Sequence, residues 1–247
     1  TSGSQMPSER LARWLARSGV ASRREADRMV ASGRVTVDGQ VPPPQGRLID
    51  PEREEVRLDG RAISQRGLQR RYLALNKPVG VVSTARDPGG RRTVLEMVED
   101  RRGLFPVGRL DTDSRGLILL TDDGDLALRL THPRYQVPKS YRVTLIGPTS
   151  REQLDALRLG PVLIDGPTHP LEVRLLRGGP RRSLLLISIA EGRRREIRRM
   201  CAAVAAKVED LERVSIGVLR MGTLAEGKAR ELSVGEVRRL RKSVGLS

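Results

Sequence analysis

The chain has 247 residues, with 46 lysines and arginines against 30 aspartates and glutamates, so its formal net charge is +16. A positive charge of this size indicates a polyanionic partner such as a nucleic acid. The aromatic residues are few, one Trp, one Phe and three Tyr, which excludes a generic platform for stacking single-stranded bases. A single cysteine, Cys201, excludes an intramolecular disulfide, and we expect it in the core.

The sequence shows no signal for a membrane or for a metal. No apolar run approaches the roughly 18 residues that a membrane-spanning helix needs, and the N-terminus lacks the regions of a signal peptide, so we expect a cytoplasmic protein. His132 and His169 each lie beside a proline, without a second ligand at metal-site spacing, so no metal site is predicted. Residues 1–7, around Met6, are interpreted as a tag remnant and a disordered N-terminus.

Residues 8–63 are predicted to form a small domain that opens with two helices. Ser8 is placed to cap the first helix and Gly19 to end it, with an apolar face formed by Leu11, Trp14 and Leu15. The second helix begins at the capping-box pattern SRRE of residues 22–25 and ends at Gly33. Two short strands follow, each before an Asp-Gly pair that favours a type I′ turn, at residues 34–37 and 56–58.

This order of two helices and a small sheet resembles an S4 RNA-binding domain, which has an α-L-like fold. The resemblance implies that the second helix contacts RNA phosphates through Ser22, Arg23, Arg24 and Arg28. Charged helix faces are commonplace, so a solvated basic surface is the alternative interpretation of these arginines.

Residues 64–70 lack apolar periodicity and are predicted to link this domain to a second one, residues 71–247. In the second domain, apolar runs favour strands at residues 72–76, 117–121, 141–146, 171–176 and 184–189. Helices are predicted at residues 126–130, 151–159, 195–206 and 234–241. The predicted fold class is α+β, with a mixed, mainly antiparallel sheet.

An acidic turn, GRLDTDSRG, occupies residues 108–116 of the second domain. Four apolar residues follow it, as is typical of a strand buried on both faces, and a loop held on such a strand suits a catalytic carboxylate at Asp111. A calcium loop fits poorly, because Arg115 stands where an oxygen ligand is required and Asp122 where the pattern has Glu. An ordinary solvated turn with surface ion pairs is the other alternative.

Further patterns accompany this turn in a fixed order: NKPVG at residues 76–80, GLILLTDDG at 116–124, KSYRV at 139–143, EGRRREIRRM at 191–200 and LERVSIG at 211–217. Together with GRLD at 108–111, they closely resemble the bacterial ribosomal-RNA pseudouridine synthases of the RsuA/RluB type. The resemblance extends over about residues 70–240.

The resemblance implies an isomerase that breaks the bond between uracil N1 and the ribose, turns the base and rejoins it through C5, with no cofactor. Asp111 matches the catalytic aspartate, which acts in its ionised form. Arg198 matches the partner arginine that keeps this carboxylate charged and aimed. Tyr141 matches the tyrosine that lies against the target base, although its residue pattern alone favours a core tyrosine on a strand.

RNA contacts in the second domain are expected from Lys77, Arg109, Lys139, Arg193, Arg194 and Arg195. For any one arginine of residues 193–195, a solvated surface is the alternative. Arg194 and Glu196 stand where the family more often has Asn and Gln, so we expect this loop to hold RNA differently.

The expected partner is ribosomal RNA, as a stem-loop or an assembly intermediate, bound by a monomer. The segment HPRY at residues 132–135, which leads to Lys139 and Tyr141, resembles the branch of the family that modifies large-subunit RNA, and this resemblance implies large-subunit (23S) RNA as the substrate. The alternatives are a small-subunit (16S) substrate and a non-catalytic RNA-binding assembly factor.

Overall fold

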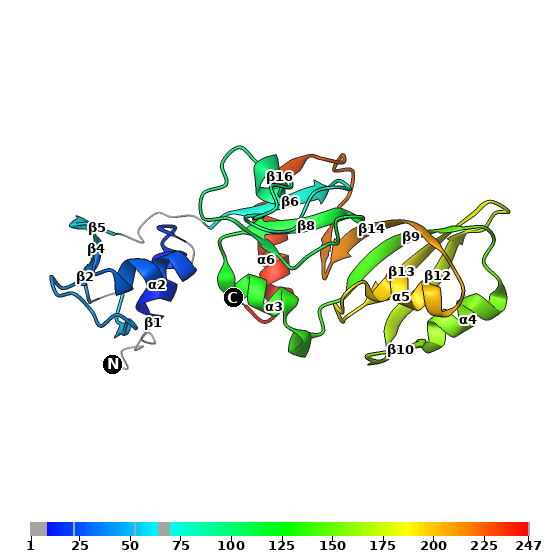
Figure 1. Cartoon of the computed structure of the whole chain (residues 1–247), viewed down its shortest axis with the longest axis horizontal. Helices are drawn as coiled ribbons and strands as arrows, with labels where there is room; N and C mark the ends of the chain where they lie inside the picture. The colour runs from blue at the N-terminus through cyan, green and yellow to red at the C-terminus, as the bar shows by residue number, and fades with distance from the viewer. Residues whose placement is uncertain (1–8, 22, 52, 64–69, 247) are drawn as a thin grey trace. The chain divides into compact units, whose positions relative to one another are not determined.

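The computed structural model describes residues 9–246 except 22, 52 and 64–69. Contacts divide the chain into two compact units, Thr1–Arg70 and Arg71–Ser247 (Figure 1). The predicted caps Ser8 and Ser22 and most of the predicted linker lie outside the described residues. None of the described helices is long and apolar enough to cross a membrane.

The first unit contains the two predicted helices and five short strands among its described residues. In chain order these are β1 (Glu9–Arg10), α1 (Leu11–Arg17), α2 (Arg23–Ala31), β2 (Val35–Val37), β3 (Leu48–Ile49), β4 (Val56–Leu58) and β5 (Arg61–Ala62). The apolar face of α1 is buried against α2 and the strands, with Leu11, Trp14 and Leu15 in one cluster with Val30 and Val35. Gly19 and Gly33 follow the helix ends with positive φ angles, as predicted.

Both predicted Asp-Gly turns are confirmed. Asp38 and Gly39 have φ angles of +49° and +78°, and Asp59 and Gly60 have +49° and +79°. A type I′ turn requires positive φ at both central residues, which Asp tolerates and Gly favours. The second turn joins β4 to β5, since Leu58 pairs with Arg61.

The second unit is built on a mixed sheet in the order β12-β13-β9-β14-β8-β6-β16, with β7 added to β8 and β15 to β14. All pairings are antiparallel except that of β14 with β8, so the predicted fold class is confirmed. Its strands are β6 (Tyr72–Lys77), β7 (Phe105–Val107), β8 (Arg115–Thr121), β9 (Lys139–Ile146), β10 (Val162–Leu163), β11 (Gly166–Pro167), β12 (Pro170–Arg177), β13 (Arg182–Ile189), β14 (Val208–Ile216), β15 (Leu219–Arg220) and β16 (Ala229–Glu231). Its helices are α3 (Gly124–Thr131), α4 (Arg151–Leu159), α5 (Glu196–Ala203) and α6 (Val234–Ser243), with 3₁₀ helices η1 (Val94–Met97) and η2 (Pro133–Tyr135).

Strand β8 is buried on both faces, as its run of apolar residues predicted. Leu117 and Leu119 lie in a cluster with side chains of α3 and α6, whereas Ile118 and Leu120 lie in a second cluster with η1 on the opposite face. The loop that precedes β8 therefore ends on a strand that is held rigidly by packing on both faces.

The other half of the sheet carries α4 and α5 on one face (Figure 1). Cys201 is fully buried there, in the same cluster as Met200, which confirms its predicted place in the core. Strand β14 joins the two halves, and at Gly116 it approaches β8 so closely that an added Cβ would lie 2.4 Å from the carbonyl oxygen of Arg213.

The predicted elements of this unit are present, but one helix is shorter than expected and several strands were not predicted. Helix α5 was expected over residues 195–206 and spans Glu196–Ala203, because Arg195 and Ala205 adopt left-handed φ angles that end it on either side. Strand β14 was not predicted, although it forms the centre of the sheet.

Candidate active site

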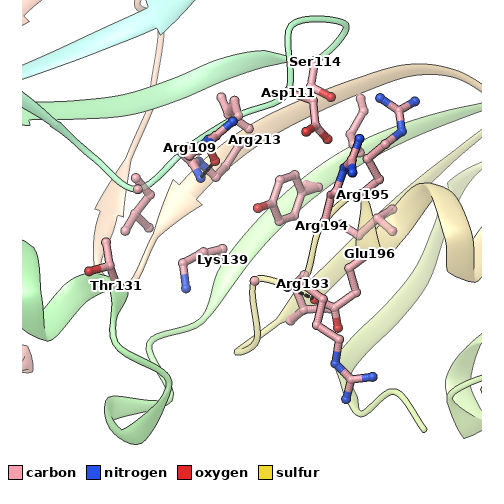
Figure 2. Close-up of a pocket in the computed structure, with 18 of the residues that line it drawn as sticks. Arg109, Asp111, Ser114, Thr131, Lys139, Arg193, Arg194, Arg195, Glu196 and Arg213 are labelled. Atoms are coloured by element: carbon pink, nitrogen blue, oxygen red, sulfur yellow. Dashed lines mark hydrogen bonds between the residues drawn. The ribbon is translucent and has the colours of Figure 1, made fainter. Parts of the chain in front are cut away.

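A cavity of about 480 Å³ lies beside the loop that precedes β8 and the start of α5 (Figure 2). This volume falls in the range of small-ligand sites. The structure brings seven of the predicted site residues to its wall: Arg109, Asp111, Lys139, Tyr141, Arg193, Arg194 and Arg195.

Asp111 is held by its backbone neighbours. The buried Ser83 hydroxyl accepts the N–H of Leu110 and donates to the carbonyl of the same residue, each at 3.0 Å. The N–H of Gly80 donates to the carbonyl of Thr112 at 2.8 Å. The residues on both sides of Asp111 are thus fixed by one segment, residues 80–83, which sequence reasoning did not assign to the site.

Lys77 is not placed to bind RNA, which corrects that expectation. Its side chain is fully buried, and its ammonium donates to the carbonyls of Pro78 and Val81 at 2.9 and 2.7 Å. Burial lowers the pKa of Lys77 to about 8, although the charges of Asp111 and Asp113 oppose this shift. Lys77 therefore supports the turn beneath the Asp111 loop from inside the protein.

The start of α5 is fastened to the same loop through Asp113. Arg195 donates to the two carboxylate oxygens of Asp113 at 3.0 and 2.8 Å. Arg198 donates to the Asp113 carbonyl at 2.7 Å and lies 3.4 Å from its carboxylate. The hydrogen bond from Arg195 is the main reason that the pKa of Asp113 is lowered.

The expected pair between Arg198 and Asp111 is therefore not formed in this structure, since Arg198 is engaged by Asp113. The hydrogen bond with Asp113 is the main reason that the pKa of Arg195 is raised, and the charge of Asp111 adds to it, so Arg195 at the cavity wall places a permanent positive charge near Asp111. Sequence reasoning missed Asp113 because an acidic residue in an exposed turn has no distinguishing pattern.

The three consecutive arginines have different surroundings. Arg193 donates to the carbonyls of Gly166 and Pro167 and pairs with Glu191, so it holds β11 against the loop before α5. Arg194 is exposed and, within the described part of the chain, makes no side-chain hydrogen bond or ion pair, which leaves it available to a ligand. Glu196 is buried and accepts the Arg193 N–H at 3.0 Å, and burial raises its pKa.

The cavity floor is one face of β9 and β14. Tyr141, 8% exposed, lies directly across from Arg213, and Lys139 is two residues earlier on the same face. Arg213 is buried and lines the cavity, but sequence analysis gave it no role. The motif at residues 211–217 did contain an indication of this place, because Arg213 follows Leu211 by two residues and a strand puts such residues on the same face.

In the first unit, Arg23, Arg24 and Arg28 are exposed on α2. Arg28 pairs with Glu25 at 2.7 Å, while Arg23 and Arg24 are open to solvent. In the described part of the chain, no group of three or more His, Cys, Asp or Glu side chains is placed to hold a metal ion.

Taken together, the cavity presents a carboxylate at one end, beside Arg194 and Arg195, with Lys139 on the other side (Figure 2). An aromatic ring and apolar side chains of Leu211, Ile189 and Ile216 form its floor. This combination suits a flat, polar ring joined to an anionic backbone, with an ionised oxygen placed to react with it.

Comparisons with known proteins find similar sequences and a similar solved structure. Residues 71–203 match the family described as RNA pseudouridylate synthase, and residues 9–41 match the S4 domain. The chain is 39% identical over 239 residues to an uncharacterized RNA pseudouridine synthase of Aquifex aeolicus, covering 96% of this chain and 95% of that one. It is 36% identical over 236 residues to the ribosomal large subunit pseudouridine synthase B of Bacillus subtilis, covering 94% and 96%. A crystal structure of a pseudouridylate synthase superposes with a TM-score of 0.66 at 29% identity, covering 94% of this chain and all of that one.

Proposed function

The chain belongs to the RNA pseudouridine synthase family and is an isomerase that acts on RNA, and we propose that its substrate is one uridine of large-subunit ribosomal RNA. The relatives named ribosomal large subunit pseudouridine synthase B, from Bacillus subtilis and Vibrio cholerae, support this choice, at 36% and 38% identity. The Vibrio cholerae relative is matched over 97% of this chain and 76% of its own length.

The observation that supports the reaction best is the position of Asp111 in the cavity that Tyr141 also lines. A uridine turned out of its RNA stack can place its ring against Tyr141, which replaces part of the lost stacking. The ribose then lies towards Asp111, whose backbone is held on both sides by residues 80–83. Such fixed placement of reacting groups is a large part of catalytic power.

We propose that the ionised Asp111 acts on the ribose, either by bonding to C1′ or by removing the C2′ proton. The C1′–N1 bond breaks and its electron pair stays with the uracil. The ring turns, C5 bonds to C1′ as the Asp111 ester is displaced or the C2′ proton returns, and the C5 proton finally moves to N1. No group is oxidised or reduced, and no cofactor is needed for this balance.

In this proposal, the roles of the arginines follow their contacts. Arg195 keeps a permanent positive charge near Asp111, and Arg198, the expected partner arginine, acts through Asp113 to position the loop. Arg194 and Arg109 at the cavity wall bind phosphates beside the target uridine. Arg23 and Arg24 of the S4 domain bind a second part of the RNA, and the protein acts as a cytoplasmic monomer.

Pseudouridine mapping of ribosomal RNA from cells with and without the gene tests the substrate. We expect one large-subunit position to lose its modification in the deletion strain and to regain it with the wild-type gene. Loss of a small-subunit position instead would overturn the large-subunit assignment, and an unchanged map would overturn ribosomal RNA as the substrate.

A further inference from the structure

Two positively charged side chains lie together on the floor of the cavity, on the face that also presents Tyr141. Lys139 is on β9, two residues before Tyr141, and Arg213 is on β14, directly across from Tyr141. The remaining floor is apolar, with Ile189 and Leu211 beside them. Charges on an apolar floor are costly unless they have a partner, so these two require an explanation.

Lys139 has spare hydrogen-bonding capacity. Its ammonium donates to the Val137 carbonyl at 3.1 Å, and this is its one hydrogen bond among the described residues, which leaves two of its three N–H groups for another acceptor. Burial, followed by the charge of Arg213, lowers the pKa of Lys139 to about 8, while Glu196 on α5 opposes this shift. Near pH 7 the side chain is still mainly a cation.

Arg213 is 2% exposed and is fixed by the backbone. Its Nε donates to the Leu117 carbonyl at 2.7 Å, and its Nη1 donates to the Arg109 carbonyl at 3.3 Å. Its Nη2 is buried and has no hydrogen-bond partner among the described residues. Arg109 is two residues before Asp111, so Arg213 joins the cavity floor to the Asp111 loop.

We propose that Lys139 and Arg213 form a cation pair that binds the two carbonyl oxygens of the uracil ring and stabilises the ring as an anion once it has left the ribose. This inference rests on the proposed function. When the C1′–N1 bond breaks, the electron pair that stays with uracil is shared among N1, O2 and O4. Preorganised positive charges at these oxygens stabilise that state more than the bound uridine, which is the condition for catalysis.

The pair also suits uracil better than cytosine. Uracil has two carbonyl oxygens, whereas cytosine has one and presents an amino group, itself a donor, at C4. Two cationic donors therefore match uracil, and one of them would face a donor if cytosine entered. A half turn of the ring about the axis through N3 and C6 moves O2 to the position of O4 and O4 to the position of O2. The same two cations can therefore bind both oxygens before and after the turn.

Single-turnover kinetics with a full-length transcript of the large-subunit ribosomal RNA tests the proposal. We expect Lys139→Met to lower the rate of pseudouridine formation by about 100-fold, as for loss of one oxyanion donor. Affinity for the transcript and its salt dependence should not change. Lys139→Arg, which keeps the cation, should retain most of the rate, and Lys242→Met, at an exposed position on α6, should behave as wild type.

The pH dependence provides a readout that a structural role would not alter. With wild-type protein, the rate should fall as pH rises through about 8, where Lys139 loses its proton. With Lys139→Arg, this fall should disappear, because arginine stays protonated. Lys77, whose pKa is also about 8, is unchanged in both proteins and cannot produce the difference.

Two results would overturn the proposal while the function stands. If Lys139→Met made product at the wild-type rate but bound RNA with a salt slope shallower by about 1, Lys139 would be a phosphate contact. If Lys139→Met and Lys139→Arg were equally slow with unchanged thermal stability, the charge would not be the cause. If wild-type protein made no pseudouridine on any RNA, the proposed function itself would fail.

Discussion

Asp113 joins the loop that carries Asp111 to the start of α5. Its carboxylate and carbonyl engage Arg195 and Arg198, which begin α5, and it lies two residues after Asp111. The family resemblance identified Arg198 but not the residue that it contacts, because the contact joins segments 85 positions apart. Motif spacing along a chain does not report which of two nearby carboxylates an arginine will face.

Asp113→Ala should therefore impair catalysis more than stability. The pair with Arg195 is partly exposed, so we expect the free energy of unfolding to change by less than about 1 kcal/mol. Loosening of the Asp111 loop should lower kcat by about 10- to 100-fold with little change in KM. The matched control is Asp155→Ala, which removes another exposed ion pair, the one with Arg158 on α4. If Asp113→Ala kept the wild-type kcat, the position of the Asp111 loop would not depend on the contacts of Asp113.

Lys77 allows a test by pH. Its pKa is lowered from 10.5 to about 8, so between these values the unfolded chain binds more protons at this residue than the folded one. The Lys77 contribution to the free energy of unfolding should therefore rise from about pH 8 to 10.5, by on the order of 3 kcal/mol. In urea titrations across this range, wild type should gain stability relative to Lys77→Met as pH rises.

The exposed Lys228→Met variant is the control for the loss of one surface lysine. Lys139 has a similar pKa but is unchanged in both comparisons. A pH-independent difference for Lys77→Met would show that Lys77 titrates normally and is not buried as the structure places it.

At the scale of elements, the strands with uniform apolar runs were predictable and β14 was not. Residues 72–76 and 117–121 form β6 and β8 as predicted, because a continuous apolar run reports burial on both faces. Strand β14 mixes Glu209, Asp210 and Glu212 with its apolar residues, since Arg115 pairs with Asp210 and Glu212 from the neighbouring β8. Because these charged residues take part in tertiary ion pairs, the sequence of β14 lacks the regular alternation of apolar and polar residues that marks a strand.

The seam between β8 and β14 depends on Gly116. A Cβ there would lie 2.4 Å from the Arg213 carbonyl oxygen and 2.6 Å from its nitrogen, and the φ angle of Gly116 is +109°. Gly116→Ala should thus destabilise the protein by about 2–4 kcal/mol, from strain and displaced backbone. Gly124→Ala, where a Cβ meets nothing within 4 Å, is the control. Equal denaturation midpoints for the two variants would show that β8 and β14 can move apart at Gly116 without a loss of stability.

At the scale of the whole molecule, the chain consists of two units, and each matches its own family. Each could be predicted from its own motifs, because the S4 and catalytic patterns are local in sequence. The cavity could be predicted only in part. Asp111, Tyr141 and the arginine loop lie in motifs whose role the family resemblance supplies. Arg213 also lies in a motif, but its place on the cavity floor follows from strand register, and Ser83 reaches Leu110 through the fold of the loops.

The S4 unit should contribute affinity without contributing chemistry. Replacement of Arg23 and Arg24 by Gln should weaken RNA binding and make the slope of log Kd against log salt shallower by about 2, one for each phosphate contact. The single-turnover rate at saturating protein should stay at the wild-type value. The paired control is Arg238→Gln with Arg239→Gln, two exposed arginines of α6. An unchanged slope in the S4 variant would place the RNA on another surface.

The most direct test of the account is pseudouridine formation by Asp111→Asn on the large-subunit transcript, with RNA affinity measured in parallel. Removal of one negative charge near RNA should leave affinity equal or stronger. We predict that Asp111→Asn binds the transcript as wild type does and makes no pseudouridine, because the amide can neither bond to C1′ nor accept the C2′ proton. Product formation by this variant at the wild-type rate would contradict the assignment of Asp111 and the mechanism built on it.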